Sequence, residues 1–166
     1  WTYPPGLDYC QRRSCGPAQP LGDEGPERKT VNCPNVSILM PGYNGGEALR
    51  TTLRNILVDP FRDYEIVISD DASSDNTAEI IRSFQDPRIR YELTDHAGYS
   101  KNLEKCRLRA KGEILFLMGQ DDILARGALQ RTVDAFSNPA VGAVTRPFFW
   151  FDDAIHRPVR ALTPHN

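Results

Sequence analysis

The stretch that decides the fold is VSILMPGYNGGEALRTTLRNILV, residues 36–58. Four of its first five residues are apolar and this run ends at Pro41-Gly42, which is typical of a short buried β-strand. Apolar side chains then recur at helical spacing, at Leu49, Leu53, Ile56 and Leu57. A strand joined by a short polar loop to an amphipathic helix is the repeating unit of an open parallel sheet.

The same alternation continues along the chain. Further strands are predicted at 64–69, 88–93, 113–118, 141–146 and 148–152, and the third of these is expected to be the most buried. Further helices are predicted at 76–84, 100–110 and 127–136. Because strands that alternate with helices are joined by right-handed crossovers, the pattern predicts an α/β fold with a mainly parallel sheet and helices on both faces.

The start of the chain differs from the rest. Residues 1–35 are rich in proline and glycine and show no apolar periodicity, so we expect an irregular arm. Residues 36–166 are expected to form one domain. The four cysteines match no standard metal-binding spacing, and free thiols in a reducing compartment are the favoured interpretation. A pair or metal site at Cys10 and Cys15 is the alternative.

Composition excludes several classes of partner. The net charge is −2 and the isoelectric point is about 5.9, so the chain has no electrostatic footprint for nucleic acid or an anionic membrane. No window is long and apolar enough for a transmembrane helix. The expected location is the cytoplasm, with the inner face of the membrane as an alternative.

The unusual polar residues fall in the connections from strand to helix. These connections are PGYNGG (41–46), DDASSDN (70–76), TDHAGYS (94–100) and GQDD (119–122). In an open parallel sheet such connections gather at the carboxyl edge, where ligands bind. The paired carboxylates of the second and fourth loops are therefore expected at one edge. Aspartate also begins turns and caps helices, so each pair has a purely structural alternative.

Two adjacent carboxylates at the end of an apolar strand indicate a bound cation. Like charges so close raise each other's pKa, and burial at the core edge adds to the cost. Mg²⁺ or Mn²⁺, held by one or two aspartates and the phosphates of a ligand, would neutralise them. The chain contains neither G-x-G-x-x-G nor G-x-x-x-x-G-K-[ST], so a dinucleotide fingerprint and a P-loop are not supported.

Three segments together resemble glycosyltransferase family 2. They are VSILMPGYNGGEALRTTLRNIL, YEIVISDDASSDNTAEIIRSF and GYSKNLEKCRLRAKGEILFLMGQDDIL, and the resemblance runs from about Val36 to Phe136. It implies the GT-A fold, a Rossmann-like sheet. It also implies transfer of a sugar from a nucleoside diphosphate sugar to an acceptor hydroxyl, with inversion and with Mg²⁺ or Mn²⁺, as in cell wall or polysaccharide biosynthesis.

The resemblance assigns roles in the first two loops. Pro41 and Tyr43 match positions that line the pocket for the base of the donor. Asp71 matches the carboxylate that hydrogen-bonds the base, which is typically uracil, and Asp70 lies beside it. A UDP-sugar is therefore the expected donor, and a saccharide or lipid-linked acceptor is expected without being identified.

The resemblance also assigns roles in the last two loops. Gly98, Lys101 and Asn102 match an element near the nucleotide. Asp121 is expected near the ribose or sugar and beside the metal, and Asp122 on the metal.

The chain departs from the family pattern in three ways. Gly119 and Gln120 stand where many members have a further aspartate and a small residue, so the number of coordinating carboxylates stays open. Lys101 replaces the more usual arginine, so its ammonium group is a point charge and cannot form the two parallel hydrogen bonds of a guanidinium. In the family the acceptor-binding half and the catalytic base follow the donor half. The chain is thus expected to be C-terminally truncated, with the base beyond Asn166.

Other polar groups are interpreted as structural. His96 lies in a ligand-side loop but has no partner that the sequence identifies. The segment FFWFDD, 148–153, is typical of a sheet edge, and a catalytic base from one of its acidic residues is the alternative.

Three other functions remain open. A module that binds a nucleotide sugar without turnover is the first. A nucleotidyltransferase would carry a basic glycine-rich loop after the first strand, and PGYNGGEAL has no basic residue. A phosphoacceptor receiver domain would place its acidic pair after the first strand, whereas here the pair follows the second.

Overall fold

The computed structural model describes residues 34–145, 149–151 and 158–161. Its helices and strands are, in chain order, β1 (Val36–Gly42), α1 (Gly46–Leu57), β2 (Tyr64–Asp70), α2 (Thr77–Ser83), β3 (Ile89–Leu93), α3 (Tyr99–Arg109), β4 (Ile114–Leu117), α4 (Ala128–Phe136), β5 (Phe149–Phe151) and β6 (Pro158–Ala161). No helix in these ranges is long and apolar enough to cross a bilayer.

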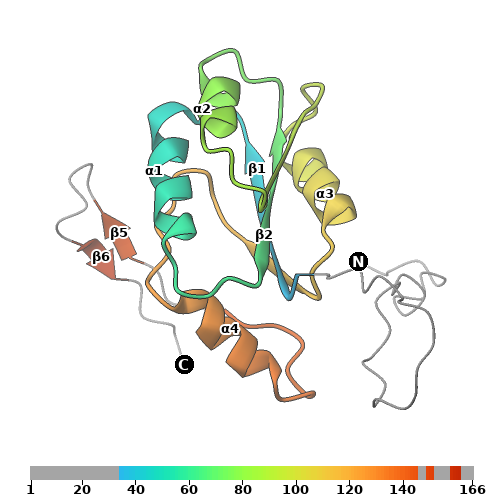
Figure 1. The fold of residues 1–166 in the computed structure, drawn as a ribbon, viewed down its shortest axis with the longest axis vertical. Coiled ribbons are helices and arrows are strands. Elements are labelled where there is room, and N and C mark those ends of the chain that lie inside the picture. Colours follow the sequence, from blue (N-terminus) through green and yellow to red (C-terminus); the bar gives the residue numbers. More distant parts are fainter. Residues whose placement is uncertain (1–33, 146–148, 152–157, 162–166) are drawn as a thin grey trace, which may run out of the picture.

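The first four strands form one parallel sheet in the order β3-β2-β1-β4 (Figure 1). Strand β1 pairs with β2 along its whole length and aligns Gly42 with Asp70 at the carboxyl edge. Strands β5 and β6 pair with each other antiparallel. The predicted α/β fold with a parallel sheet is confirmed.

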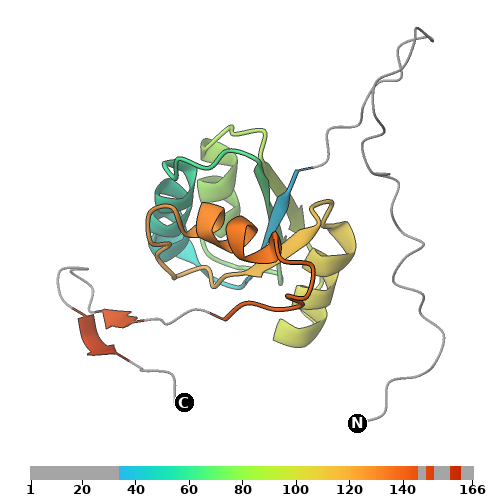
Figure 2. The ribbon, with the colours of Figure 1, turned by 90° about the horizontal axis from the view of Figure 1, so that it is seen from below.

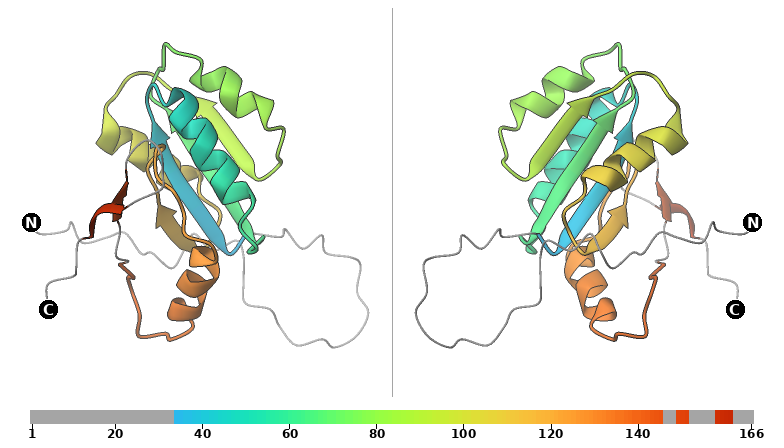
Figure 3. Two further views of the ribbon diagram at one scale, coloured as in Figure 1. Left: turned by 90° about the vertical axis from the view of Figure 1, so that its left-hand side faces the viewer. Right: turned by 90° about the vertical axis from the view of Figure 1, so that its right-hand side faces the viewer.

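Helices cover both faces of the sheet, as predicted. Helices α1 and α2 lie on one face and α3 on the other (Figure 3). Figure 2 shows the sheet from below, with α4 nearest the viewer. The larger core cluster joins the sheet to α1, α2 and α4 and includes Ile38, Met40, Leu53, Ile66, Ile81 and Leu129. The smaller cluster, under α3, contains Leu39, Val67 and Cys106. Cys106 is buried as a free thiol.

The segment predicted to be the most buried strand is an edge strand. In β4 the exposed fractions of Leu115 and Leu117 are 45% and 53%. The prediction was wrong because an unbroken apolar run indicates a strand without telling whether both of its faces are covered. The sheet order places β4 outermost among the four strands, where α3 does not cover it.

Two other expectations concern the ends of the chain. The strand predicted at 141–146 is absent from its described part, 141–145, which has no regular structure. The strand predicted at 148–152 is present as β5 over Phe149–Phe151. Most of the predicted N-terminal arm and the acidic pair Asp152-Asp153 lie outside the described residues.

A partly buried ion pair stabilises the amino edge of the sheet. The Glu65 carboxylate of β2 lies 2.7 Å from the Arg90 guanidinium of β3. It also accepts hydrogen bonds from the Ser37 hydroxyl of β1 at 2.7 Å and from the Lys111 N–H at 2.6 Å. Burial raises the pKa of Glu65, but these donors outweigh burial and hold the pKa below its ordinary value. The network thus links three neighbouring strands and the turn before β4.

Candidate functional site at the carboxyl edge

The candidate site lies where the chain reverses its direction of travel across the sheet. From β1 the chain adds β2 and β3 on one side and then returns to place β4 on the other side of β1. In doubly wound sheets, ligands bind at this switch point, outside the carboxyl ends of the two strands. The loop after β1 and the loop after β4 meet there.

Gln120 joins these two loops. Its Oε1 accepts a hydrogen bond from the Tyr43 N–H at 3.0 Å, and its Nε2 donates one to the Tyr43 carbonyl at 2.9 Å. A Cβ on Gly42 or Gly45 would lie 2.9 or 2.6 Å from the same Oε1. The glycines of PGYNGG therefore make room for Gln120. Sequence analysis noted Gln120 only as a departure from the family, although the glycines were a signal that another group approaches closely.

The carboxylates of Asp121 and Asp122 converge beside Gly119. A Cβ on Gly119 would lie 3.0 Å from Asp121 Oδ1 and 2.9 Å from Asp122 Oδ2, so both oxygens border one small space. Asp122 Oδ2 also accepts a hydrogen bond from the Gly119 N–H at 2.8 Å. Both aspartates are exposed. Two hard oxygen ligands at one solvent-accessible point fit Mg²⁺ or Mn²⁺.

The protein itself supplies little else for a cation. The described residues contain no group of three or more histidine, cysteine or acidic side chains that could hold a metal ion. Within the same ranges, neither Asp121 nor Asp122 forms a salt bridge with a basic side chain. The pair therefore has no basic side chain of the described residues to balance its charge.

Asp71 is buried and joins the loop after β2 to the loop after β3. Its carboxylate accepts hydrogen bonds from the Ala97 N–H at 2.7 Å and the Gly98 N–H at 2.9 Å. Burial raises the pKa of Asp71, but the two backbone donors and nearby His96 outweigh burial and hold the pKa below its ordinary value. The next residue, Ala72, has a φ of 65°, a conformation that is strained for a residue with a side chain.

His96 and Tyr43 form an aromatic surface above Asp71. The two rings are tilted with centroids 5.1 Å apart. His96 Nδ1 lies 3.0 Å from the Asp71 carbonyl oxygen and 3.2 Å from its carboxylate. Both rings are well exposed, Tyr43 at 48%. The interpretation of His96 as a loop residue without a partner missed this contact, because Tyr43 and Asp71 belong to different loops.

Asp70 is fully buried, and both of its carboxylate oxygens are engaged within the protein. Oδ1 accepts hydrogen bonds from the Ser73 N–H at 2.9 Å and from the Ser73 hydroxyl at 2.5 Å. Oδ2 accepts one from the Tyr91 hydroxyl at 3.0 Å. Asp70 therefore shapes the loop that carries Asp71.

The remaining candidate residues divide into buried and exposed. Pro41 is buried within β1. Asn102 is buried, and its amide donates to the Gly42 and Ser69 carbonyls at 3.2 and 2.7 Å, which ties α3 to the ends of β1 and β2. Gly98, with a φ of 84°, precedes α3, and Lys101 is exposed on that helix. The structure thus brings Tyr43, Asp71, Gly98, Asp121 and Asp122 to one edge.

Comparisons with known proteins agree with this geometry. Residues 37–163 match the sequence profile of glycosyl transferase family 2. The chain is 34% identical over 100 residues to the GalNAc(5)-diNAcBac-PP-undecaprenol beta-1,3-glucosyltransferase of Campylobacter jejuni, a match covering 58% of this chain and 32% of that protein. The chain spans about a third of the length of curated relatives such as this one.

Two solved structures share the fold. The mannosyltransferase PcManGT from Pyrobaculum calidifontis, in complex with GDP-Man and Mn²⁺, has a TM-score of 0.62 and 27% identity, covering 69% of this chain and 36% of that one. TarS of S. aureus in complex with UDP-GlcNAc has a TM-score of 0.59 and 21% identity, covering 62% and 31%, and it supports the fold alone. With the α/β sheet, the loops at its carboxyl edge and the profile match, the chain belongs to glycosyltransferase family 2 and has the GT-A fold.

Proposed function

We propose that the carboxyl edge binds a nucleoside diphosphate sugar together with Mg²⁺ or Mn²⁺. The observation that carries the proposal is the convergence of the Asp121 and Asp122 carboxylates beside Gly119, with no basic partner among the described residues. A diphosphate facing these carboxylates would be repelled unless a cation lay between them. The structure of PcManGT, which is in complex with GDP-Man and Mn²⁺, supports this class of ligand.

The whole protein is proposed to transfer the sugar to an acceptor hydroxyl with inversion. A divalent cation at Asp121 and Asp122 would supply Lewis-acid stabilisation of the leaving diphosphate. The Gln120 bridge keeps the two ligand-binding loops together, and Asp71 keeps the loop of His96 in place. The aromatic surface of Tyr43 and His96 is where we place the base of the donor.

The acceptor and the general base belong to the same proposal. We place the base beyond Asn166, and we propose a saccharide or lipid-linked acceptor at the cytoplasmic side of the membrane. The Campylobacter relative, whose name includes an undecaprenol diphosphate acceptor, supports this acceptor class. A nucleotide-sugar-binding module without turnover is the second candidate. It predicts metal-dependent UDP binding without acceptor-dependent release of UDP from UDP-sugars.

Calorimetric titration of UDP and GDP in Mn²⁺ and in EDTA tests the proposal. Mn²⁺ should tighten UDP binding at least tenfold, because it removes the repulsion between the diphosphate and the carboxylates. Asp122→Asn should abolish most of this enhancement. Asp134→Asn is the matched control, since Asp134 is also an acidic residue but lies on α4 and accepts a hydrogen bond from Gln130. Equal UDP affinity of the unmodified protein in Mn²⁺ and EDTA would refute the metal site.

A further inference from the structure

Helix α1 has a polar stripe beside its apolar one. Its apolar residues Leu49, Leu53 and Ile56 face the sheet. Thr52 and Asn55 are three residues apart, so they share an adjacent face of the helix. The loop from Met118 to Gly127, here called the acidic loop, passes alongside α1 between β4 and α4 (Figure 1).

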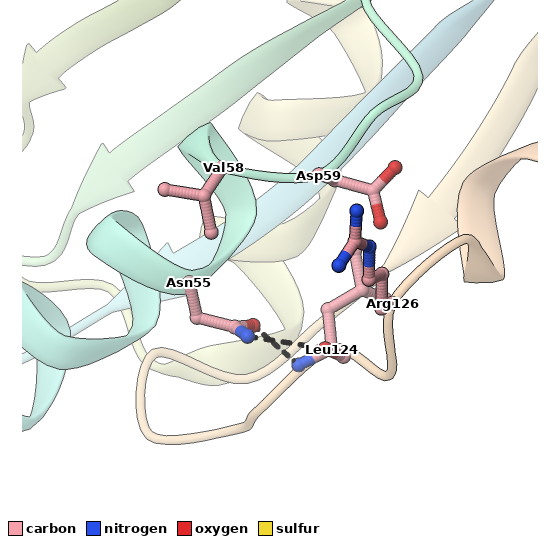
Figure 4. A pocket seen from close by; sticks show the side chains of 5 residues that line it. All are labelled: Asn55, Val58, Asp59, Leu124 and Arg126. Carbon is pink, nitrogen blue, oxygen red and sulfur yellow. Dashed lines mark hydrogen bonds between the residues drawn. The ribbon is translucent and has the colours of Figure 1, made fainter.

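The polar stripe is hydrogen-bonded to the backbone of the acidic loop. The Thr52 hydroxyl donates to the Asp122 carbonyl at 2.9 Å. The Asn55 amide makes a reciprocal pair with Leu124, donating to its carbonyl at 3.1 Å and accepting from its N–H at 2.6 Å (Figure 4). Just past the helix, Asp59 Oδ2 accepts from the Gly127 N–H at 2.9 Å. The loop is thus held at three points along its length.

These bonds matter because the acidic loop has no strand or helix to satisfy its backbone. A buried carbonyl or N–H without a partner costs free energy, so partners from α1 favour one arrangement of the loop. Thr52 is fully buried and Asp59 is 3% exposed, so water competes little for these bonds. The Asn55 pair borders a shallow pocket of about 240 Å³ lined by Asn55, Val58, Asp59, Leu124 and Arg126.

The three contacts differ in what they hold. Asp59 bonds Gly127, directly before α4, and so fastens that helix. Thr52 bonds the carbonyl of Asp122 itself, and Asn55 bonds the backbone two residues later. A shift of that backbone would move the Asp122 carboxylate, which lies beside Gly119 with that of Asp121.

We propose that Thr52 and Asn55 are positioning residues that hold the acidic loop in the arrangement in which Asp121 and Asp122 can share one divalent cation. This inference rests on the proposed function for its cation. Neither residue stands out in the sequence, because the bonds join positions about 70 residues apart.

The test compares Thr52→Val with Thr52→Ser. Valine keeps the shape of threonine but leaves the Asp122 carbonyl without its donor, whereas serine keeps the hydroxyl. Thr132→Val is the matched control, because Thr132 is also buried and its hydroxyl bonds the Ala128 carbonyl within α4. Asn55→Ala provides a second, partly exposed site, should Thr52→Val fail to fold.

Two measurements are made on each full-length variant. The first is the ratio of UDP dissociation constants in EDTA and in Mn²⁺. The second is amide hydrogen exchange across residues 119–127 without metal, compared with exchange in the core of β2. Thr52→Val and Asn55→Ala should each reduce the Mn²⁺ enhancement about five- to tenfold and speed exchange in the loop more than in β2. Thr52→Ser and Thr132→Val should keep both close to those of the unmodified protein.

The outcomes separate this inference from the proposed function. If the unmodified protein shows no Mn²⁺ enhancement, the proposed function fails, and the inference about a shared cation fails with it. If the enhancement is present but Thr52→Val and Asn55→Ala both retain it, or Thr132→Val reduces it equally, the positioning role is wrong. The same conclusion holds if exchange rises equally in the loop and in β2, since that result means a general loss of stability.

Discussion

At the amino edge of the sheet, Glu65 is buried and lies 2.7 Å from Arg90, whereas at the carboxyl edge Asp121 and Asp122 are exposed without a basic partner in the described ranges. The two edges belong to the same four strands, so their difference does not arise from the fold class. Removing one member of a buried ion pair is destabilising, because it leaves the other charge without a partner. Two exposed carboxylates that border one space beside Gly119 instead suit the external cation that we propose. The comparison therefore separates acidic residues that hold the fold from acidic residues that we propose to bind a ligand.

Asp70 and Asp71 are intermediate between these two cases. Both lie at the carboxyl edge, yet both are buried and accept hydrogen bonds from hydroxyl groups or backbone N–H groups. They shape the ligand-side loops, so we expect their removal to affect stability and nucleoside binding together. Asp71→Ala should thus weaken UDP binding even in EDTA, unlike Asp122→Asn.

The largest expected loss of unfolding free energy is for a substitution at the amino edge of the sheet. Glu65→Ala leaves the Arg90 guanidinium, the Ser37 hydroxyl and the Lys111 N–H without their acceptor. Breaking a buried pair from one side costs about 3–5 kcal/mol, and we expect a loss of about 3 kcal/mol of unfolding free energy, because Arg90 is 29% exposed and keeps its hydrogen bond to the Arg109 carbonyl. Urea denaturation measures this loss, and the Mn²⁺ enhancement of UDP binding by the folded protein should be unchanged. A loss of that enhancement would show that the two edges are coupled. The distinction between residues that stabilise the fold and residues that bind the ligand would then be wrong.

A smaller loss of unfolding free energy is expected from Tyr91→Phe, which removes the hydrogen bond to Asp70. A bond to a charged group contributes about 1.5–3 kcal/mol. Burial, followed by the bond to Asp70, raises the pKa of Tyr91 to about 12, from 10.0. Below pH 10 the contribution of this group is fully present. As the pH rises from 10 toward about 12, the unfolded chain loses the phenol proton first, so the contribution is lost.

Urea denaturation across this alkaline range measures the dependence on Tyr91. The unmodified protein should lose stability more steeply than Tyr91→Phe between pH 10 and about 12. Parallel stability curves for the two proteins would contradict the assignment.

The third prediction concerns metal-dependent UDP binding and a substitution at Gly119. Gly119→Ala would place a Cβ within about 3 Å of both converging carboxylates, so the carboxylates must move apart. We expect the Mn²⁺ enhancement of UDP binding to fall about tenfold, or ~1.4 kcal/mol. Gly142→Ala is the control, since a Cβ there meets no atom of the described residues within 4 Å. An undiminished enhancement in Gly119→Ala, measured by calorimetry, would show that the cation does not use this space.

The smallest effect is expected on the stability of Asp122→Asn. An exposed carboxylate without a cation partner contributes little to folding, so the unfolding free energy should change by less than about 0.5 kcal/mol in EDTA. The difference in unfolding free energy between Asp122→Asn and Glu65→Ala therefore distinguishes the two edges most clearly. A loss of several kcal/mol in Asp122→Asn would place this residue among those that hold the fold.

The sequence by itself determined the alternation of strands and helices, because the periods of 2 and 3.6 residues are local properties. It also determined that the acidic pairs follow strands β2 and β4, which in a parallel sheet requires them to share one edge. The family pattern in the ligand-side loops could be recognised for the same reason, since each motif is continuous in the chain. These features were enough to predict the α/β fold class and to identify Asp71, Asp121 and Asp122 as candidate site residues.

The tertiary structure alone decided which strand lies at the edge and which side chains join the loops. The run EILFLM is equally apolar in a central or an outer strand, and only the strand order exposes Leu115 and Leu117. The bridge from Gln120 to Tyr43 joins residues 77 positions apart, and the bonds from α1 to the acidic loop join residues about 70 apart. Such contacts leave no periodic signal, because they depend on how elements pack and not on the order of neighbouring residues.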